Sequence, residues 1–165
     1  MKTKIAVLFF VLMFTTQLWA INPVAKIMAQ KDAPLLITYY YAAYQEGGRY
    51  TSEGIRHAVE YKNVSDRQVV AVQIGLVSFD VWNEFMDRTG GVAIVEIAPG
   101  GSEKGTWVAR AYADFAFLTG FAYVGKVRFS DGTIWAADLD AIAEEMRKIE
   151  RDFDVQTLKG KPEKK

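Results

Sequence analysis

The chain has a single histidine and no cysteine, so few of its residues could carry out acid–base or nucleophilic chemistry. A histidine acts as a general base only beside a positioned partner, such as a serine nucleophile or a carboxylate. His57 falls on the apolar face of an alternating segment, no serine adjoins it, and the sequence has no Gly-x-Ser-x-Gly motif. We therefore interpret His57 as a hydrogen-bonded structural residue, predict no catalytic residue, and expect that the protein is not an enzyme.

Carboxylates gather in two places, and acidic pairs can hydrolyse glycosides or bind Ca²⁺. The two clusters are Asp80, Glu84 and Asp87, and Asp131, Asp138 and Asp140. Neither has the spacing of an EF-hand, and turns and helix caps use aspartate at such positions. The glycine-rich segment 99–105 lacks the Lys–Ser/Thr pair of a phosphate-binding loop, and the lack of cysteine rules out thiolate metal centres. The sequence thus predicts no metal site and no cofactor, with Ca²⁺ binding by the acidic clusters as the alternative.

Large aromatic side chains are the main surplus of this sequence. In the first predicted strand, Tyr39 and Tyr41 face one way, while Tyr40 and Tyr44 face the other. Either a helix covers the outer of these faces, or exposed tyrosines serve in recognition. Aromatic residues at strand spacing more often pack in a core. The possible recognition surface that we single out consists of Tyr40, Tyr44, Trp82 and Trp107.

Residues 1–20 have the order of a secretory signal peptide. Lys2 and Lys4 precede the apolar run 5–14, and Ala20 is the predicted last residue before cleavage. Spanning a bilayer takes ~20 apolar residues, and this run is about half that length, so a cleaved signal is favoured over an anchor. We expect a periplasmic or secreted protein with no membrane span after cleavage.

The composition excludes several classes of protein. The 20 Lys and Arg residues balance 20 Asp and Glu residues, which argues against nucleic acid as a partner because phosphate neutralisation needs a cationic surplus. Half of the residues are hydrophobic, so the chain should fold. Its length fits one domain, and without disulfides its stability must come from an apolar core.

From residue 35 onward the sequence reads as strands separated by turns, after a lead-in segment at 21–34. The predicted strands are 35–44, 55–62, 68–80, 92–98, 106–117, 122–130 and a last one from 134. Residues 83–91 are polar and turn-rich, and Asp131-Gly132 between apolar residues is typical of a two-residue type I′ hairpin. About seven strands without intervening helices predict an all-β, antiparallel β-sandwich.

A helix is predicted over 138–153, at the end of a domain that spans 35–155. Its apolar positions repeat at steps of three and four, which places them on one stripe, and Asp138 is a suitable N-cap. The stripe is short for a free coiled coil, so we expect it to dock on the protein's own sheet. Residues 156–165 are rich in lysine and are predicted to form a disordered basic tail.

The stretch 58–65, together with 69–74, Phe79-Asp80 and Pro99-Gly100, resembles the small bacterial immunoglobulin-like modules of the FxLYD kind. In those modules a strand ends at an Asn-x-Ser turn, the next ends in an aromatic–Asp step, and Pro-Gly precedes the returning strand. Residues 126–135 are similar to endings of uncharacterised exported bacterial proteins. The resemblance covers about 58–135 and implies an immunoglobulin-like fold without shared catalytic residues. Asn63-Val64-Ser65 also fits a glycosylation sequon.

Taken together, these features predict an exported, non-enzymatic binding or accessory module of the bacterial envelope. Its partner would be another envelope protein or a glycan. The alternative is a small β-barrel that carries an apolar ligand. A carrier needs an empty interior, whereas a sandwich fills the space between its sheets.

Overall fold

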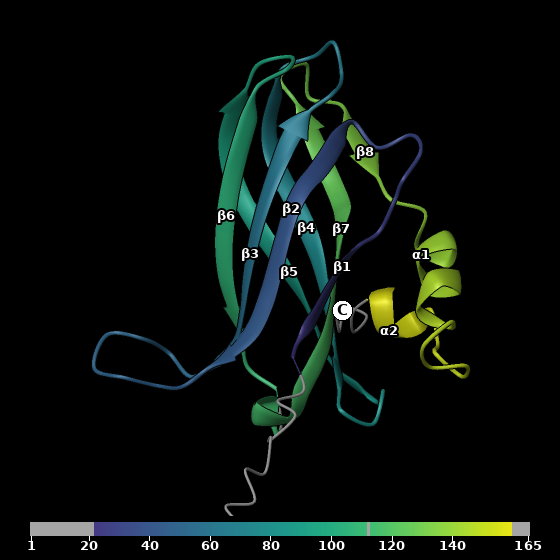
Figure 1. The fold of residues 1–165 in the computed structure, drawn as a ribbon. Helices are drawn as coiled ribbons and strands as arrows, with labels where there is room; N and C mark the ends of the chain where they lie inside the picture. The colour runs from purple at the N-terminus through teal and green to yellow at the C-terminus, as the bar shows by residue number, and fades with distance from the viewer. Residues whose placement is uncertain (1–21, 112, 160–165) are drawn as a thin grey trace, which may run out of the picture.

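The computed structural model describes residues 22–111 and 113–159. The predicted signal peptide and residues 160–165 of the predicted tail lie outside the described residues. The strands and helices are β1 (Val24–Ile27), β2 (Leu35–Gln45), β3 (Gly54–Asn63), β4 (Val69–Asp80), β5 (Phe85–Ile97), β6 (Ser102–Ala109), the 3-10 turn η1 (Asp114–Ala116), β7 (Phe117–Phe129), β8 (Ile134–Ala136), α1 (Leu139–Met146) and α2 (Gln156–Lys159). Figure 1 shows two sheets lying face to face, with both helices on one side.

The sandwich consists of a larger sheet, called sheet A here, and a three-stranded sheet B. Sheet A has the order β1-β7-β4-β5, and β8 pairs with β7; sheet B has the order β2-β3-β6. β1 and β8 pair with successive stretches of β7, at 119–122 and 126–128. Between them the Gln30 side chain bonds both backbone groups of Val124, at 2.7 and 3.0 Å. The predicted all-β sandwich is confirmed at this level.

The first strand is a departure from the predicted antiparallel arrangement. β1 lies within the segment expected to be a lead-in, and it runs parallel to β7. Only four residues long and exposed throughout, it shows no alternation of apolar and polar residues. Its pairing depends on a strand almost a hundred residues away, which local sequence patterns do not report.

The two sheets enclose one apolar core. Among the most deeply buried large side chains there are Tyr61, Phe129, Ile55, Ile74 and Leu76. They come from alternate positions of β3, β4 and β7, because successive side chains of a strand point to opposite faces. Strand β4 is buried on both faces, which explains its nearly continuous apolar sequence.

The other face of sheet A is covered by the C-terminal segment. Ile142, Met146, Phe153 and Leu158 pack there on residues of β4 and β7, such as Phe79. The stripe therefore docks on the protein's own sheet, and Asp138 caps α1 by accepting hydrogen bonds from two backbone amides. None of the helices in the described ranges has the length and apolar character that crossing a membrane requires.

The helix is shorter than the predicted 138–153. It ends at Met146, and the chain then turns through shorter-range hydrogen bonds such as Ile149 N to Met146 O at 2.9 Å. The turns still bring Phe153 to the sheet, so the apolar spacing is satisfied without one continuous helix. The expected disorder of 156–165 is wrong for 156–159, because α2 forms there and buries Leu158.

The hairpin between β7 and β8 forms where the sequence predicts it, but its turn is not type I′. Only Gly132 has a positive φ, of 85°, whereas a type I′ turn needs two such residues. Asp131 instead accepts hydrogen bonds from the Thr133 amide and hydroxyl, at 2.9 and 2.6 Å. The aspartate side chain thus stabilises a longer loop with a single left-handed residue.

Candidate functional site

His57 and Tyr40 form the one pair of sequence-selected polar side chains that meets in the core. They lie on neighbouring strands and point between the sheets, where the Tyr40 hydroxyl and His57 Nδ1 share a hydrogen bond of 2.9 Å. Their rings are parallel, at an interplanar angle of 3°, and Phe117 meets the imidazole edge-on. His57 is fully buried. Burial lowers the pKa of His57 to about 4 and raises that of Tyr40, so both are neutral at physiological pH.

This pair cannot perform acid–base chemistry on a solute. His57 has no exposed surface, and its Nε2 has no hydrogen-bond partner within the described ranges. Tyr40 is only 7% exposed, and its hydroxyl lies so close to β7 that a Cβ at Gly120 would overlap it. The selection of Tyr40 for a recognition surface is therefore wrong. The pair fills the core as a hydrogen-bonded structural unit.

The other three selected residues lie in different settings. Tyr44 is half-buried near the end of β2, where its hydroxyl donates to Glu53 Oε1 at 2.9 Å; this hydrogen bond raises the pKa of Tyr44 to about 12. Trp107 is half-buried at the β5–β6 side of the sandwich, against Gly91 and Gly105. Trp82, in the turn before β5, is 78% exposed. The structure does not assemble these residues into one surface, and only Trp82 presents most of its ring to solvent.

The exposed tyrosines are the ones that were not selected. Tyr39 and Tyr41 of β2 are 48% and 45% exposed on the outer face of sheet B, and Leu36 of the same strand is about half exposed. We call this surface the tyrosine face; it comprises Leu36, Tyr39 and Tyr41 of β2, Ala58 and Glu60 of β3, and Lys104 and Thr106 of β6. The helices cover sheet A and leave sheet B open, as Figure 1 shows.

The tyrosine face combines aromatic and charged groups. Tyr39 lies across from Glu60, and Glu60 lies across from Lys104 on the next strand. A shallow hollow of about 330 Å³ adjoins them, lined by Thr38, Glu60, Ser102, Glu103 and Lys104. The face therefore offers amphipathic rings beside charges of both signs, on rigid paired strands.

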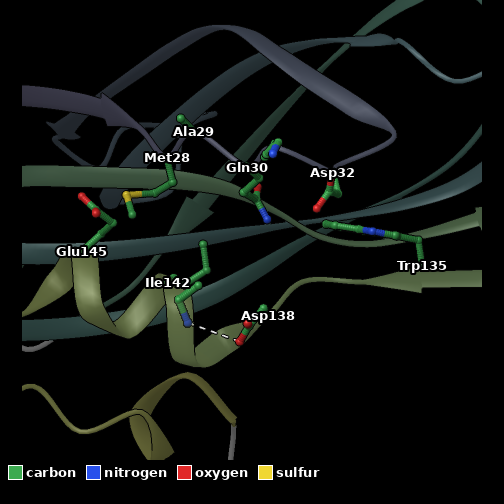
Figure 2. Close-up of a pocket in the computed structure, with 10 residues that line it drawn as sticks. Met28, Ala29, Gln30, Asp32, Trp135, Asp138, Ile142 and Glu145 are labelled. Carbon is green, nitrogen blue, oxygen red and sulfur yellow. Dashed lines mark hydrogen bonds between the residues drawn. The ribbon is translucent and has the colours of Figure 1, made fainter.

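A second hollow, of about 270 Å³, lies between the segment after β1 and helix α1. Figure 2 shows Trp135 reaching into it opposite Met28, with Asp32 and Glu145 near its rim. Two of its other polar groups already have structural roles, since Asp138 caps α1 and Gln30 bonds the backbone of Val124. In the part of the chain that the structure describes, no group of three or more His, Asp or Glu residues could hold a metal ion. This hollow is therefore a weaker candidate than the tyrosine face.

Comparisons with known proteins inform the fold only. No protein-family model matches the chain, and no curated protein is detectably similar. Among solved structures the chain is similar to a hypothetical protein from Peptoclostridium difficile 630, with a TM-score of 0.50 at 10% identity over 76% of this chain and 100% of that one. It also matches a Northeast Structural Genomics Consortium target, SoR45, with a TM-score of 0.38 at 14% identity over 63% and 80% of the two chains. The first likeness is one of fold alone, and the second carries no argument.

Proposed function

We propose that the protein is an exported, non-enzymatic binding module that recognises another protein of the bacterial envelope through the tyrosine face. The observation that carries this proposal is the uncovered outer face of sheet B. Helices α1 and α2 shield sheet A, yet Tyr39 and Tyr41 stay about half exposed on sheet B. We infer export from the order of residues 1–20, which is that of a secretory signal peptide.

The character of this face favours a protein partner over a glycan. Tyrosine is enriched at protein interfaces because it supplies a large contact area while losing little conformational freedom. Glu60 and Lys104 lie beside the rings and can pair with charges of a partner. The hollow next to them is shallow and polar, so it would enclose little of a sugar.

The contents of the core support a binding module over a carrier or an enzyme. Large side chains such as Tyr61 and Phe129 occupy the space between the sheets, where a carrier would hold its ligand. The only histidine is buried against Tyr40 and is neutral. Kinship with the immunoglobulin-like modules of the FxLYD kind is part of the proposal, supported by the two packed sheets. The parallel β1 and the C-terminal helices would be additions to that fold.

The proposal is tested by binding with matched variants. Purified wild type, a Tyr39→Ser/Tyr41→Ser double variant and a Trp82→Ser variant are each immobilised and exposed to envelope extract. We expect wild type and Trp82→Ser to retain the same protein, and the double variant to lose it. Because all three positions are exposed, the variants should unfold at similar denaturant concentrations.

Retention of the same protein by the double variant would contradict the proposal. So would retained material that survives protease treatment, because it would then be a glycan rather than a protein.

A further inference from the structure

A cluster of hydrogen-bond donors lies on sheet A beside helix α1, on the opposite side of the sandwich from the tyrosine face. A cavity of about 90 Å³ opens there. Its lining residues are Gln73, Gly75, Arg88, Gly90, Tyr123, Gly125, Lys126, Ala136, Ala137 and Leu139. None of the ten is acidic, and two of them, Arg88 and Lys126, are cationic.

Arg88 is the central group of this cavity. Its Nε atom is buried and has no hydrogen-bond partner among the described residues, and none of the ion pairs found there includes Arg88. Asp87 precedes it in β5, where alternation directs the two side chains to opposite faces. Arg88 as a whole is half-buried, but its Nε is shut off from solvent, and a buried donor without a partner is costly because its lost hydration is not replaced.

Glycines on three neighbouring strands shape the wall of the cavity next to Arg88. Gly75 and Gly90 are paired across β4 and β5, and the Tyr123 ring lies over Gly75 so closely that a Cβ there would overlap it. On β7 the register with β4 shifts at Gly125, as in a β-bulge. The glycines let the Tyr123 ring and the Gln73 side chain lie close to the sheet, and the cavity of about 90 Å³ beside these groups has space for about three water molecules, or a small oxyanion in their place, at ~30 Å³ per water.

The donors around this opening share one chemical character. The guanidinium of Arg88, the ammonium of Lys126 and the hydroxyl of Tyr123 can each donate a hydrogen bond. Gln73 adds an amide whose Nε2 lies within 2.8 Å of where a Cβ on Gly90 would be. A guanidinium binds two oxygens of one anion at once, which makes it the most selective of these groups.

We propose that this cavity is an oxyanion-binding site, in which Arg88 and Lys126 hold a small tetrahedral anion or a carboxylate group. The site is independent of the tyrosine face, since it lies on the other sheet. The anion accepts a hydrogen bond from the buried Nε of Arg88 and bridges β5 to β7 next to the start of α1. Bound anion therefore stabilises the folded chain by mass action.

The test is a titration of ¹⁵N-labelled protein with phosphate, sulfate or acetate, with chloride replaced at constant ionic strength. We expect saturable shifts of the amide signals of Gly75, Gly90 and Gly125. Arg88→Gln should weaken binding by at least about tenfold, as loss of hydrogen bonds to a charged group does. Saturation by phosphate and sulfate alone indicates a tetrahedral anion, and saturation by acetate as well indicates a carboxylate ligand; both support the proposal.

Arg56→Gln is the matched control, because Arg56 is an exposed arginine of β3, on the other sheet from the cavity. It should change the affinity by less than about twofold, since salt screens its distant charge. Lys126→Gln is a second test variant at an exposed position, in case Arg88→Gln does not fold; it should weaken binding more than Arg56→Gln does. Shifts that stay linear with anion concentration, or equal affinity in the wild type and the test variant, would overturn the proposal.

Discussion

The buried histidine makes stability depend on pH in a way that can be calculated. Burial lowers the pKa of His57 from 6.5 to about 4 in the folded chain. Below 6.5 the unfolded chain therefore binds a proton that the folded chain does not, and the free energy of unfolding falls with pH. Each pKa unit is equivalent to ~1.4 kcal/mol, so the full loss is about 3 kcal/mol, complete below pH 4. By the same relation, about 2 kcal/mol of it is present at pH 5.

The assay is urea unfolding of the wild type and a His57→Gln variant at pH 7 and pH 5. Glutamine does not titrate, so wild type should lose about 2 kcal/mol more than the variant between these two pH values. Asp87 and Glu150, whose pKa values are raised by burial, act in the opposite direction in both proteins and cancel from the difference. Because the chain has one histidine, its NMR titration also reads the pKa directly. Equal pH dependence of the two proteins, or a measured pKa near 6.5, would refute the reasoning.

Two further substitutions test the packing of the sandwich. Phe153→Ala should lower the free energy of unfolding by about 3 kcal/mol, because the ring is buried against the aromatic side chains of sheet A. The control Arg151→Ala, at an exposed position, should change this free energy by less than ~0.5 kcal/mol. Equal effects of the two substitutions would show that the C-terminal segment does not dock on the sheet. Asn63→Ala should lower the free energy of unfolding by about 2 kcal/mol in the same assay, since the buried amide donates to two backbone carbonyls, at 2.7 and 3.0 Å. An effect no larger than that of Lys62→Ala, at an exposed position, would contradict this role.

The class of fold could be predicted because it depends on local patterns. Alternation of apolar residues marks β3 and β7, and the stripe and the Asp138 cap mark the start of α1. The predicted strand boundaries were less accurate where pairing with a neighbouring strand outweighs the low strand propensity of the residues. Residues 83–91 contain Asn, Asp and Gly, which are poor strand formers, and yet β5 begins at Phe85 because β4 offers a long edge to pair with.

The candidate site was predicted only in part, for a reason of long-range structure. Alternation correctly separates Tyr39 and Tyr41 from Tyr40 and Tyr44, but it cannot say which face of a strand meets the second sheet. Tyr39 and Tyr41 lie on the face of β2 that is turned away from sheet A. This face stays open because the helices cover sheet A rather than sheet B. Arg88 was missed because it lies in the segment expected to be a polar turn.

The sequon at Asn63 is another case in which a local sequence pattern does not report burial. Its three residues match the pattern for glycosylation, but the Asn63 side chain is fully buried and its amide nitrogen already donates twice. A buried amide with two backbone partners is not available as an acceptor of a glycan. The turn uses asparagine for hydrogen bonding, which the sequence pattern alone does not distinguish.

The most direct test of the central claim is site-specific photo-crosslinking in the intact envelope. A benzophenone amino acid replaces Tyr41 in one sample and the more exposed Trp82 in another, and each is irradiated in cells that export the protein. The account predicts a covalent adduct with one envelope protein from position 41 and none from position 82. An adduct from position 82 alone, or no adduct from position 41, would contradict recognition through the tyrosine face.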